Sequence, residues 1–140
     1  MRGDKYVIRP FETADLEAFC QQVGQPVPKS IPGPAFTCLC EGKVIGSAGI
    51  VPKHPGVGEA WILLTADALL HGLVVARHTK RGLARLMEEG GYRRVQITIE
   101  HGQDDLIGWM HFLGFQIEGI MRKYGRDGAD HYLCARLNGG

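Results

Sequence analysis

Two of the cysteines have a spacing that could bind a metal ion. Cys38 and Cys40 stand two residues apart, the only metal-like spacing in the chain. On a strand, a period of two places both thiols on one face, but no second pair of ligands follows to complete a tetrahedral site. We therefore predict no metal site and interpret Cys20, Cys38, Cys40 and Cys134 as buried free thiols.

A row of arginines could bind anions. Arg77, Arg81 and Arg85 recur every four residues, with His78 and Lys80 beside them, so they share one face of a predicted helix. A solvated helix face is the default interpretation. The alternative is contact with a phosphate group or an acidic partner, for which guanidinium forks are well suited.

A third set of side chains could transfer protons. Carboxylates, imidazoles and phenols are the usual general acids and bases, and the chain has 15 acidic residues, six histidines and four tyrosines. Each also fits an exposed or packing position, so the residue types alone do not choose between these roles. The choice depends on the elements that position them.

Length and composition predict one soluble domain. The 140 residues fit a single domain over 1–140, and 16 basic residues nearly balance 15 acidic ones. No overall field therefore recruits nucleic acid or an anionic membrane. No window approaches the roughly 20 apolar residues that span a bilayer, and the N-terminus lacks an apolar signal core. We expect a cytoplasmic protein.

The first half of the chain predicts a strand, a helix and two further strands before a central one. The strands are predicted at residues 6–9, 35–40, 43–51 and 59–65. Thr13 would cap the helix, which ends near Gly24 because a proline-rich loop follows over residues 25–34. Glu41-Gly42 suits a tight hairpin, and residues 52–58 form a second turn. An antiparallel meander is the simplest pairing.

The second half predicts a crossover unit. Thr65 would cap a long helix over residues 66–89, ended by Gly90-Gly91 and weakened at Gly82. Its apolar face would contain Leu69, Leu73, Ala76, Leu83 and Met87. Residues 94–100 then alternate as a strand, which should lie parallel to the strand at 59–65 through a right-handed connection.

A second helix and a hairpin complete the chain. The helix would start at Asp104 or Asp105 and stop at Gly114, after which Phe115 folds back on the last turn. It would bury Leu106, Trp109, Met110 and Leu113. The hairpin, over residues 116–124 and 130–137, turns through residues 125–128 and offers an edge strand that could pair with a second copy in a homodimer.

Two segments in this order resemble a known superfamily. The opening Tyr6-Val7-Ile8-Arg9-Pro10 with Thr13-Ala14-Asp15-Leu16, and the ending Leu113-Gly114-Phe115-Gln116-Ile117-Glu118-Gly119 with Tyr124-Gly125 and Asp127-Gly128, are similar to the start and end of GNAT N-acetyltransferases. The resemblance covers almost the whole chain. It implies an α/β (α+β) GNAT fold: a mixed sheet of six to seven strands with three to four helices, splayed between the strands at 59–65 and 94–100. Glu59-Ala60-Trp61 and the compact ending resemble a branch often encoded by bacteriophages, which would place the protein in the host cytoplasm.

The resemblance implies acetyl-CoA as the acetyl donor. A primary amine of a small molecule, or a protein lysine or N-terminus, would be the acceptor. Unpaired strand edges in the splay could pair with the pantetheine arm, and the long helix would direct its first amides at the pyrophosphate. The implied cofactor contacts are Leu63, Leu64, Thr65, Ala66, His71, Gly72 and Gln103. Glu59 would remove the amine proton, and His54 could share that role. Arg77, Arg81 and Arg85 could reach the 3′-phosphate of CoA.

The chain departs from the family at two positions. The segment from Thr65 to Gly72 has one late glycine where the family has a glycine-rich loop, and Asp67 places a negative charge near the phosphates. Four residues before Gly114, where the family commonly has a proton-donating tyrosine, stands Met110. His111, Tyr124 or Tyr132 could replace that tyrosine. These departures leave a second hypothesis open: a catalytically degenerate GNAT-fold binding protein, or a phage-associated structural or interaction protein.

Overall fold

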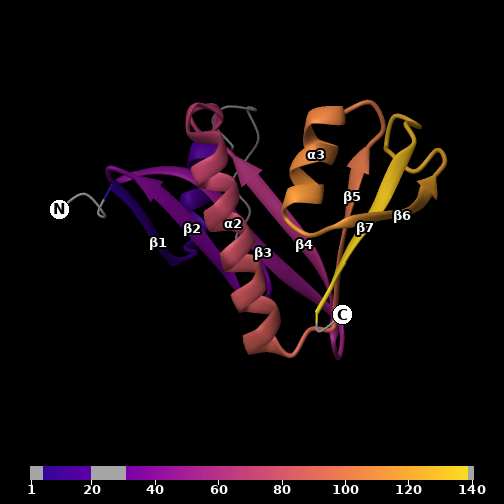
Figure 1. Ribbon diagram of the computed structural model, residues 1–140, viewed down its shortest axis with the longest axis horizontal. Coiled ribbons are helices and arrows are strands. Elements are labelled where there is room, and N and C mark those ends of the chain that lie inside the picture. The colour runs from indigo at the N-terminus through magenta and orange to yellow at the C-terminus, as the bar shows by residue number, and fades with distance from the viewer. Residues whose placement is uncertain (1–4, 20–30, 139–140) are drawn as a thin grey trace.

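The computed structural model describes residues 5–19 and 31–138, which form a mixed seven-stranded sheet with helices packed on it. The strand order is β1-β2-β3-β4-β5-β7-β6. The strands are β1 (Tyr6–Pro10), β2 (Ala35–Cys40), β3 (Lys43–His54), β4 (Val57–Leu64), β5 (Arg94–Glu100), β6 (Gln116–Met121) and β7 (His131–Leu137). The helices are the 3-10 helix η2 (Thr13–Leu16), α2 (Ala68–Gly90) and α3 (Asp104–Phe112). In Figure 1, α2 crosses the strands of the N-terminal half and α3 lies over the C-terminal half. The predicted fold class is confirmed.

β2, β3 and β4 form the predicted three-stranded antiparallel meander, and β1 pairs antiparallel with β2. Glu41 and Gly42 join β2 to β3 with φ angles of 50° and 81°. Both lie in the left-handed region, whose twist matches that of a two-residue hairpin. β4 is the fourth of seven strands, as its apolar sequence predicted.

The turn between β3 and β4 is shorter than predicted. β3 continues to His54, and the chain reverses at Pro55-Gly56, where Gly56 has a φ of 82°. β3 accommodates Pro52 because the strand register shifts between Pro52 and His54, and a bulge does not require a ladder hydrogen bond from proline. Lys53 therefore lies on a strand beside β4 rather than in a loop.

The N-cap of the first helix lies one residue before the predicted cap, and the helix begins at Thr13. Glu12, not Thr13, is the N-cap of η2, and its backbone N–H donates to Oδ2 of Asp15 at 2.9 Å. A side chain three residues into the helix thus satisfies a backbone donor that a threonine cap would leave free. Residues 17–19 continue as helix, while the predicted end near Gly24 lies outside the described residues.

The long helix also begins later than predicted. Asp67 is the N-cap of α2, whereas the Thr65 hydroxyl donates to the carbonyl of Ile45 at 3.2 Å and so anchors the end of β4. Gly72 departs from helical geometry, with φ 7° and ψ −84°. This kink separates a first turn, Ala68 to His71, from the body of α2. Gly91 ends the helix with a φ of 69°, as expected.

Gly82 is not the weak point of α2. A Cβ at this position would lie 2.3 Å from Cζ of Phe36, a buried ring on β2. The glycine therefore allows the helix to approach the sheet closely. Its role is in packing, which local helix propensity does not reveal.

The core lies between the sheet and the two helices. Its main cluster includes Ile50, Leu83, Met87, Met110, Leu113 and Phe115. Two leucines predicted to be buried are not: Leu73 is 56% exposed and Leu106 is 37% exposed. Leu73 follows the kink at Gly72, which changes the helix face, and Leu106 lies in the first turn of α3. The side chain of Leu69 lies outside the description.

The C-terminal half has the predicted order. Gly114 has a φ of 99°, and the N–H of Phe115 donates to the carbonyl of Met110 at 2.9 Å. The buried Phe115 ring confirms the predicted helix stop. The hairpin strands are shorter than predicted, because β6 ends at Met121 and β7 begins at His131. Tyr124 therefore lies in the connecting loop, not on a strand.

The described cysteines are free thiols in the interior. Cys38, Cys40 and Cys134 are all buried, and the first two share a core cluster with Ile45. Burial raises the pKa of Cys38 to about 11, with a smaller contribution from Cys40. Cys20 lies outside the described residues. Among the described helices, none is long and apolar enough to cross a membrane.

Candidate functional site

The central feature of the molecule is a separation between two neighbouring parallel strands. β4 and β5 pair at only three positions, and the last pair is Glu59 with Gln96. β4 then continues to Leu64 and β5 to Glu100 without further pairing to each other. Figure 1 shows the two strands side by side at one end and diverging into a V. Backbone groups on the facing edges are therefore available to a ligand.

An apolar cavity of about 270 Å³ lies in this V, on the side covered by α3. Its lining residues are Ile62, Leu64, Ile97, Thr98, Ile99, Leu106, Trp109 and Met110. Alternation along β4 turns Ile62 and Leu64 toward α3. The cavity thus combines an apolar wall with strand edges that can form hydrogen bonds. This combination suits a flexible chain that carries amide groups.

Glu59 occupies the narrow end of the V. Its side chain is 34% exposed, and Oε1 lies 3.3 Å from Nζ of Lys53 on β3. Strand alternation places Glu59 and Trp61 on the face opposite to Ile62, and the Trp61 ring packs edge-on against Phe11 at 5.2 Å. A carboxylate at this point can accept a proton from a group that arrives on the face away from α3. His54 is exposed at the end of β3, beside Val57.

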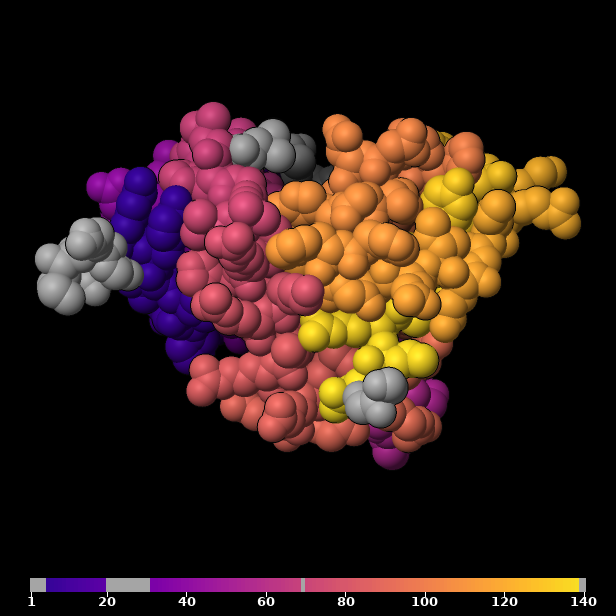
Figure 2. All heavy atoms as spheres, viewed as in Figure 1, coloured from indigo at the N-terminus to yellow at the C-terminus, as the bar shows by residue number. Residues whose placement is uncertain are grey.

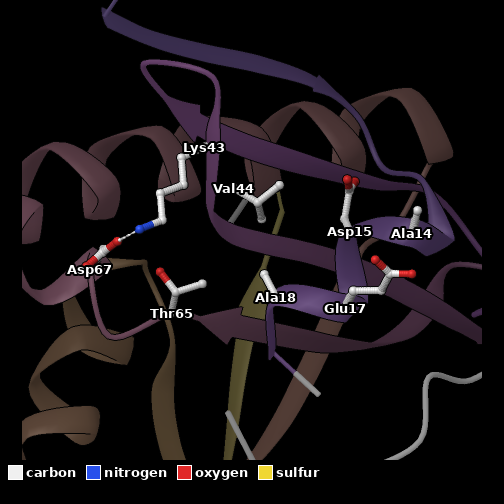
Figure 3. Close-up of a pocket in the computed structure, with 8 residues that line it drawn as sticks. All are labelled: Ala14, Asp15, Glu17, Ala18, Lys43, Val44, Thr65 and Asp67. Carbon is white, nitrogen blue, oxygen red and sulfur yellow. Dashed lines mark ion pairs between the residues drawn. The ribbon is translucent and has the colours of Figure 1, made fainter. Parts of the chain in front are cut away.

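The start of α2 carries the charge that the sequence identified as unfavourable to phosphate. Figure 3 shows Asp67 and Lys43 pointing toward each other at one end of a hollow of about 600 Å³, with Asp15 and Glu17 toward the other end. Oδ2 of Asp67 lies 2.6 Å from Nζ of Lys43. The hydrogen bond from Lys43 lowers the pKa of Asp67, and the same bond raises the pKa of Lys43. The negative charge of Asp67 is therefore balanced within the chain.

His71 is tied to the first strand. Its Nδ1 lies 2.6 Å from the hydroxyl oxygen of Tyr6, and the Tyr6 ring also lies 5.9 Å from that of His78. This contact fixes the first turn of α2, before the kink at Gly72, against β1. His71 is thus held by the protein itself.

The arginine row lies beside a different groove. Arg81 and Arg85 line a hollow of about 490 Å³ between α2 and strands β1 and β2, with Phe36 among its other lining residues. Arg85 also pairs with Glu89, with 3.2 Å between Nε and Oε2. No residue lining this groove belongs to β4 or β5. Arg77, the third arginine of the row, is exposed and does not line this groove, and the alternative contact of the row with CoA stays a prediction.

The candidate proton donors lie outside the cavity. Met110 is buried and lines it, whereas His111, the next residue, is exposed. Tyr124 is 52% exposed and contacts the ring of His131, and the Tyr132 ring lies 5.3 Å from that of His101. None of these three hydroxyl or imidazole groups lines the cavity.

The structure brings together only part of the predicted site. Leu64 lines the cavity, Leu63 faces the other side of β4, and Thr65 is buried behind the strand end. Ala66 is exposed, as is Gln103, the N-cap of α3. Six cavity residues were not predicted to belong to the site: Ile62, Ile97, Thr98, Ile99, Leu106 and Trp109. The alternation of apolar residues along β4 and β5 could have identified the isoleucines. The position of Trp109 on the same helix as Met110 could have identified it as a cavity residue.

Comparison with solved structures finds the same architecture over nearly the whole chain. A GNAT-family acetyltransferase from Streptococcus pneumoniae matches with a TM-score of 0.75 and 19% identity, covering 96% of this chain and 99% of that one. The ribosomal-protein-S18-alanine N-acetyltransferase from Escherichia coli matches with a TM-score of 0.75 and 21% identity, covering 94% and 93%.

A third structure was determined with a bound ligand. It is a GNAT-family acetyltransferase from Elizabethkingia anophelis with acetyl-CoA bound, matched with a TM-score of 0.72 and 13% identity over 96% of this chain and 99% of that one. No family model and no curated protein matches the sequence. The seven-stranded sheet, its splay and these matches show that the chain has the fold of the GNAT acetyltransferases.

Proposed function

We propose that the protein is an N-acetyltransferase that moves the acetyl group of acetyl-CoA directly to a primary amine. The observation that carries this proposal is the separation of β4 and β5 after the Glu59–Gln96 pair. The facing strand edges can hydrogen-bond to the amides of the pantetheine arm from both sides. The apolar cavity between them would hold the methylene groups of that arm.

The donor would extend from this cavity toward the start of α2. Residues 66–72 would hold the pyrophosphate, with the kink at Gly72 allowing the first turn to follow the phosphates. Lys43 supports this placement, because its ion pair with Asp67 reduces the repulsion that a free carboxylate would exert on a phosphate. Leu64, Thr65 and Ala66 lie on the path between the two parts.

Glu59 would act as the base. Its carboxylate faces the side of the sheet away from α3, so an amine could approach there while the thioester lies in the V. Backbone N–H groups on the free edge of β4 would stabilise the oxyanion that develops on the thioester carbonyl. Since Met110 has no proton to donate, our proposal assigns no side-chain acid, and the thiolate would leave unprotonated. Thiols with a pKa of about 8.5 are leaving groups good enough for this.

The fold does not determine which kind of molecule carries the acceptor amine. Among the similar structures, one acts on an alanine of a ribosomal protein and another is a spermidine N-acetyltransferase chimera. We therefore propose an acceptor amine on a small molecule or on a protein lysine or N-terminus. Glu59 and Trp61 would lie beside it.

Calorimetry and a matched pair of variants test the proposal. We expect acetyl-CoA to bind the purified protein by isothermal titration, and no binding at millimolar acetyl-CoA would refute it. Glu59→Gln should reduce the acetylation of an amine panel at saturating acetyl-CoA by about 100-fold or more, with little change in acetyl-CoA affinity. Glu88→Gln, at an exposed carboxylate on α2, is the matched control and should behave as the parent protein.

The burial of Met110 favours a second candidate function. With a thioether at the position of the family's proton donor, the fold could serve as a binding or interaction module without catalysis. In that case the protein would purify with a stoichiometric protein partner and without CoA. It would also show no acetylation of the amine panel, which separates the two candidates.

A further inference from the structure

The proposed base already holds a primary alkylammonium group from its own chain. Nζ of Lys53 lies 3.3 Å from Oε1 of Glu59, and the two side chains are 48% and 34% exposed. The pair arises from the hairpin: Val51 is the direct partner of Glu59, and Lys53 lies two residues further along β3, in the bulge between Pro52 and His54. The extension of β3 to His54 is what keeps Lys53 on this strand.

Other described lysines have different partners. Lys43 pairs with Asp67, Lys80 lies over the ring of Phe112 at 5.0 Å, and Lys5 lies over that of Tyr6 at 5.7 Å. Among the ion pairs of the described residues, Lys53 is the lysine that contacts Glu59. It carries the same functional group as the acceptor in the proposed reaction. Its four-carbon stem also lets the nitrogen move while Glu59 remains in reach.

We infer that Lys53 is itself an acetyl acceptor, modified within its own chain when acetyl-CoA occupies the V. This inference rests on the proposed function. Glu59 takes one proton from the Lys53 ammonium, and the freed nitrogen lone pair attacks the thioester carbonyl carbon. A C–N bond forms, the C–S bond breaks, and the sulfur leaves as thiolate with the electron pair of that bond. The nitrogen loses its second proton to water or to the thiolate, which leaves an amide on Lys53.

The modification would change the site. An acetylated lysine has no charge and cannot form an ion pair with a carboxylate. Glu59 would then be released from its internal cation and be available to an external amine. Acceptor turnover would therefore rise as Lys53 becomes acetylated.

The test follows each lysine separately by mass spectrometry. The full-length protein is incubated near neutral pH with acetyl-CoA labelled with ¹³C in the acetyl group, so that new acetyl groups differ in mass from any acquired during expression. Lys43, Lys80 and Lys123 serve as internal comparators. We expect Lys53 to be labelled at least about tenfold faster than the comparators, at a rate independent of protein concentration, because the step lies within one chain.

Two variants make the result specific. Glu59→Gln should slow labelling of Lys53 by about 100-fold or more and leave the comparators unchanged, because it removes the base. Lys123→Arg, at an exposed position in the β6–β7 loop, should leave labelling of Lys53 unchanged.

Four outcomes would overturn the inference. Labelling of Lys53 at the rate of the comparators in a protein that binds acetyl-CoA would remove Lys53 as an acceptor and leave the proposed function intact. Undiminished labelling in Glu59→Gln would show that Glu59 does not act on Lys53. A rate that rises with protein concentration would show transfer between chains. If acetyl-CoA does not bind, both this inference and the proposed function fail.

Discussion

Lys43, the first residue of β3, places Nζ 2.6 Å from Oδ2 of Asp67, the N-cap of α2. The pair joins a hairpin to the helix start that we propose to hold the pyrophosphate. An acidic N-cap there would repel an anion, but in the folded chain its charge is met by an ammonium group. Asp67 by itself would disfavour phosphate binding at this helix start. Its ion pair with Lys43 makes phosphate binding possible there.

The Lys43–Asp67 pair predicts that one substitution weakens acetyl-CoA binding and that a second substitution restores it. Lys43→Met should weaken acetyl-CoA binding by about three- to tenfold, because it leaves Asp67 unbalanced. Adding Asp67→Asn should restore the affinity, since the repelling charge is then removed. Titration calorimetry at low and high salt checks both effects, which should shrink with salt. Lys123→Met is the control and should keep the affinity of the parent protein for acetyl-CoA. Equal losses of affinity in Lys43→Met and Lys123→Met would contradict the proposed role of Lys43.

The buried carboxylate of Asp15 predicts a stability that depends on pH. It accepts hydrogen bonds from Nη2 of Arg9 and from the Thr37 hydroxyl, each at 2.6 Å. Burial raises the pKa of Asp15, but these hydrogen bonds outweigh it and hold the pKa below its usual value. Asp15→Asn should therefore lower the free energy of unfolding by about 1–3 kcal/mol at pH 7.

The sign of the pH dependence follows from the lowered pKa. The stabilisation by Asp15 is present above the unfolded value of about 3.9 and is lost as pH falls through the folded pKa. Urea denaturation should thus show a gap in the free energy of unfolding between the parent protein and Asp15→Asn at pH 7. This gap should narrow at pH 3 and below. Glu12→Gln, at an exposed carboxylate 3.9 Å from Arg9, should change stability little at either pH. A gap that widens in acid would be inconsistent with this account.

The contact between Gly82 and Phe36 predicts an unusual effect of alanine in a helix. Gly82→Ala would place Cβ 2.3 Å from the Phe36 ring, so it should destabilise the protein by about 1–3 kcal/mol despite the gain of about 1 kcal/mol in helix propensity. Gly108→Ala is the matched control, because its Cβ would meet open space in α3 and should stabilise by up to about 1 kcal/mol. Thermal or urea unfolding measures both. Equal stabilisation by the two substitutions would disprove the packing role of Gly82.

Because Met110 is buried and has no proton to donate, we predict that its side chain contributes only to packing. Met110→Leu conserves volume, so it should cost less than about 1.5 kcal/mol and leave turnover at saturating acetyl-CoA within about twofold of the parent. Steady-state kinetics with an acceptor from the amine panel provides the measurement. A tenfold or greater loss with normal folding would show that the thioether takes part in catalysis.

Much of the fold could be predicted because its signals are local. Glu41-Gly42, Gly114-Phe115 and the alternation over β5 each specify a backbone conformation through the residues themselves. The sequence-based predictions were wrong where residues far apart in the sequence determine the local structure. β3 runs through Pro52 because its ladder with β4 includes a bulge, and Gly82 packs closely because Phe36 lies beneath it.

The sequence by itself determined the order of the elements, the position of the helix stop and the presence of Glu59 on a central strand, although β4 begins at Val57 and not at Glu59 as predicted. Those properties follow from periodicity and from backbone preferences over a few residues. Only the tertiary structure decided that the splay between β4 and β5 begins after the Glu59–Gln96 pair, and that Lys43 and Lys53 contact Asp67 and Glu59 respectively. These relations depend on how separate strands and helices pack, because a contact between side chains on different elements is fixed by the geometry of the whole sheet and not by the residues near either one.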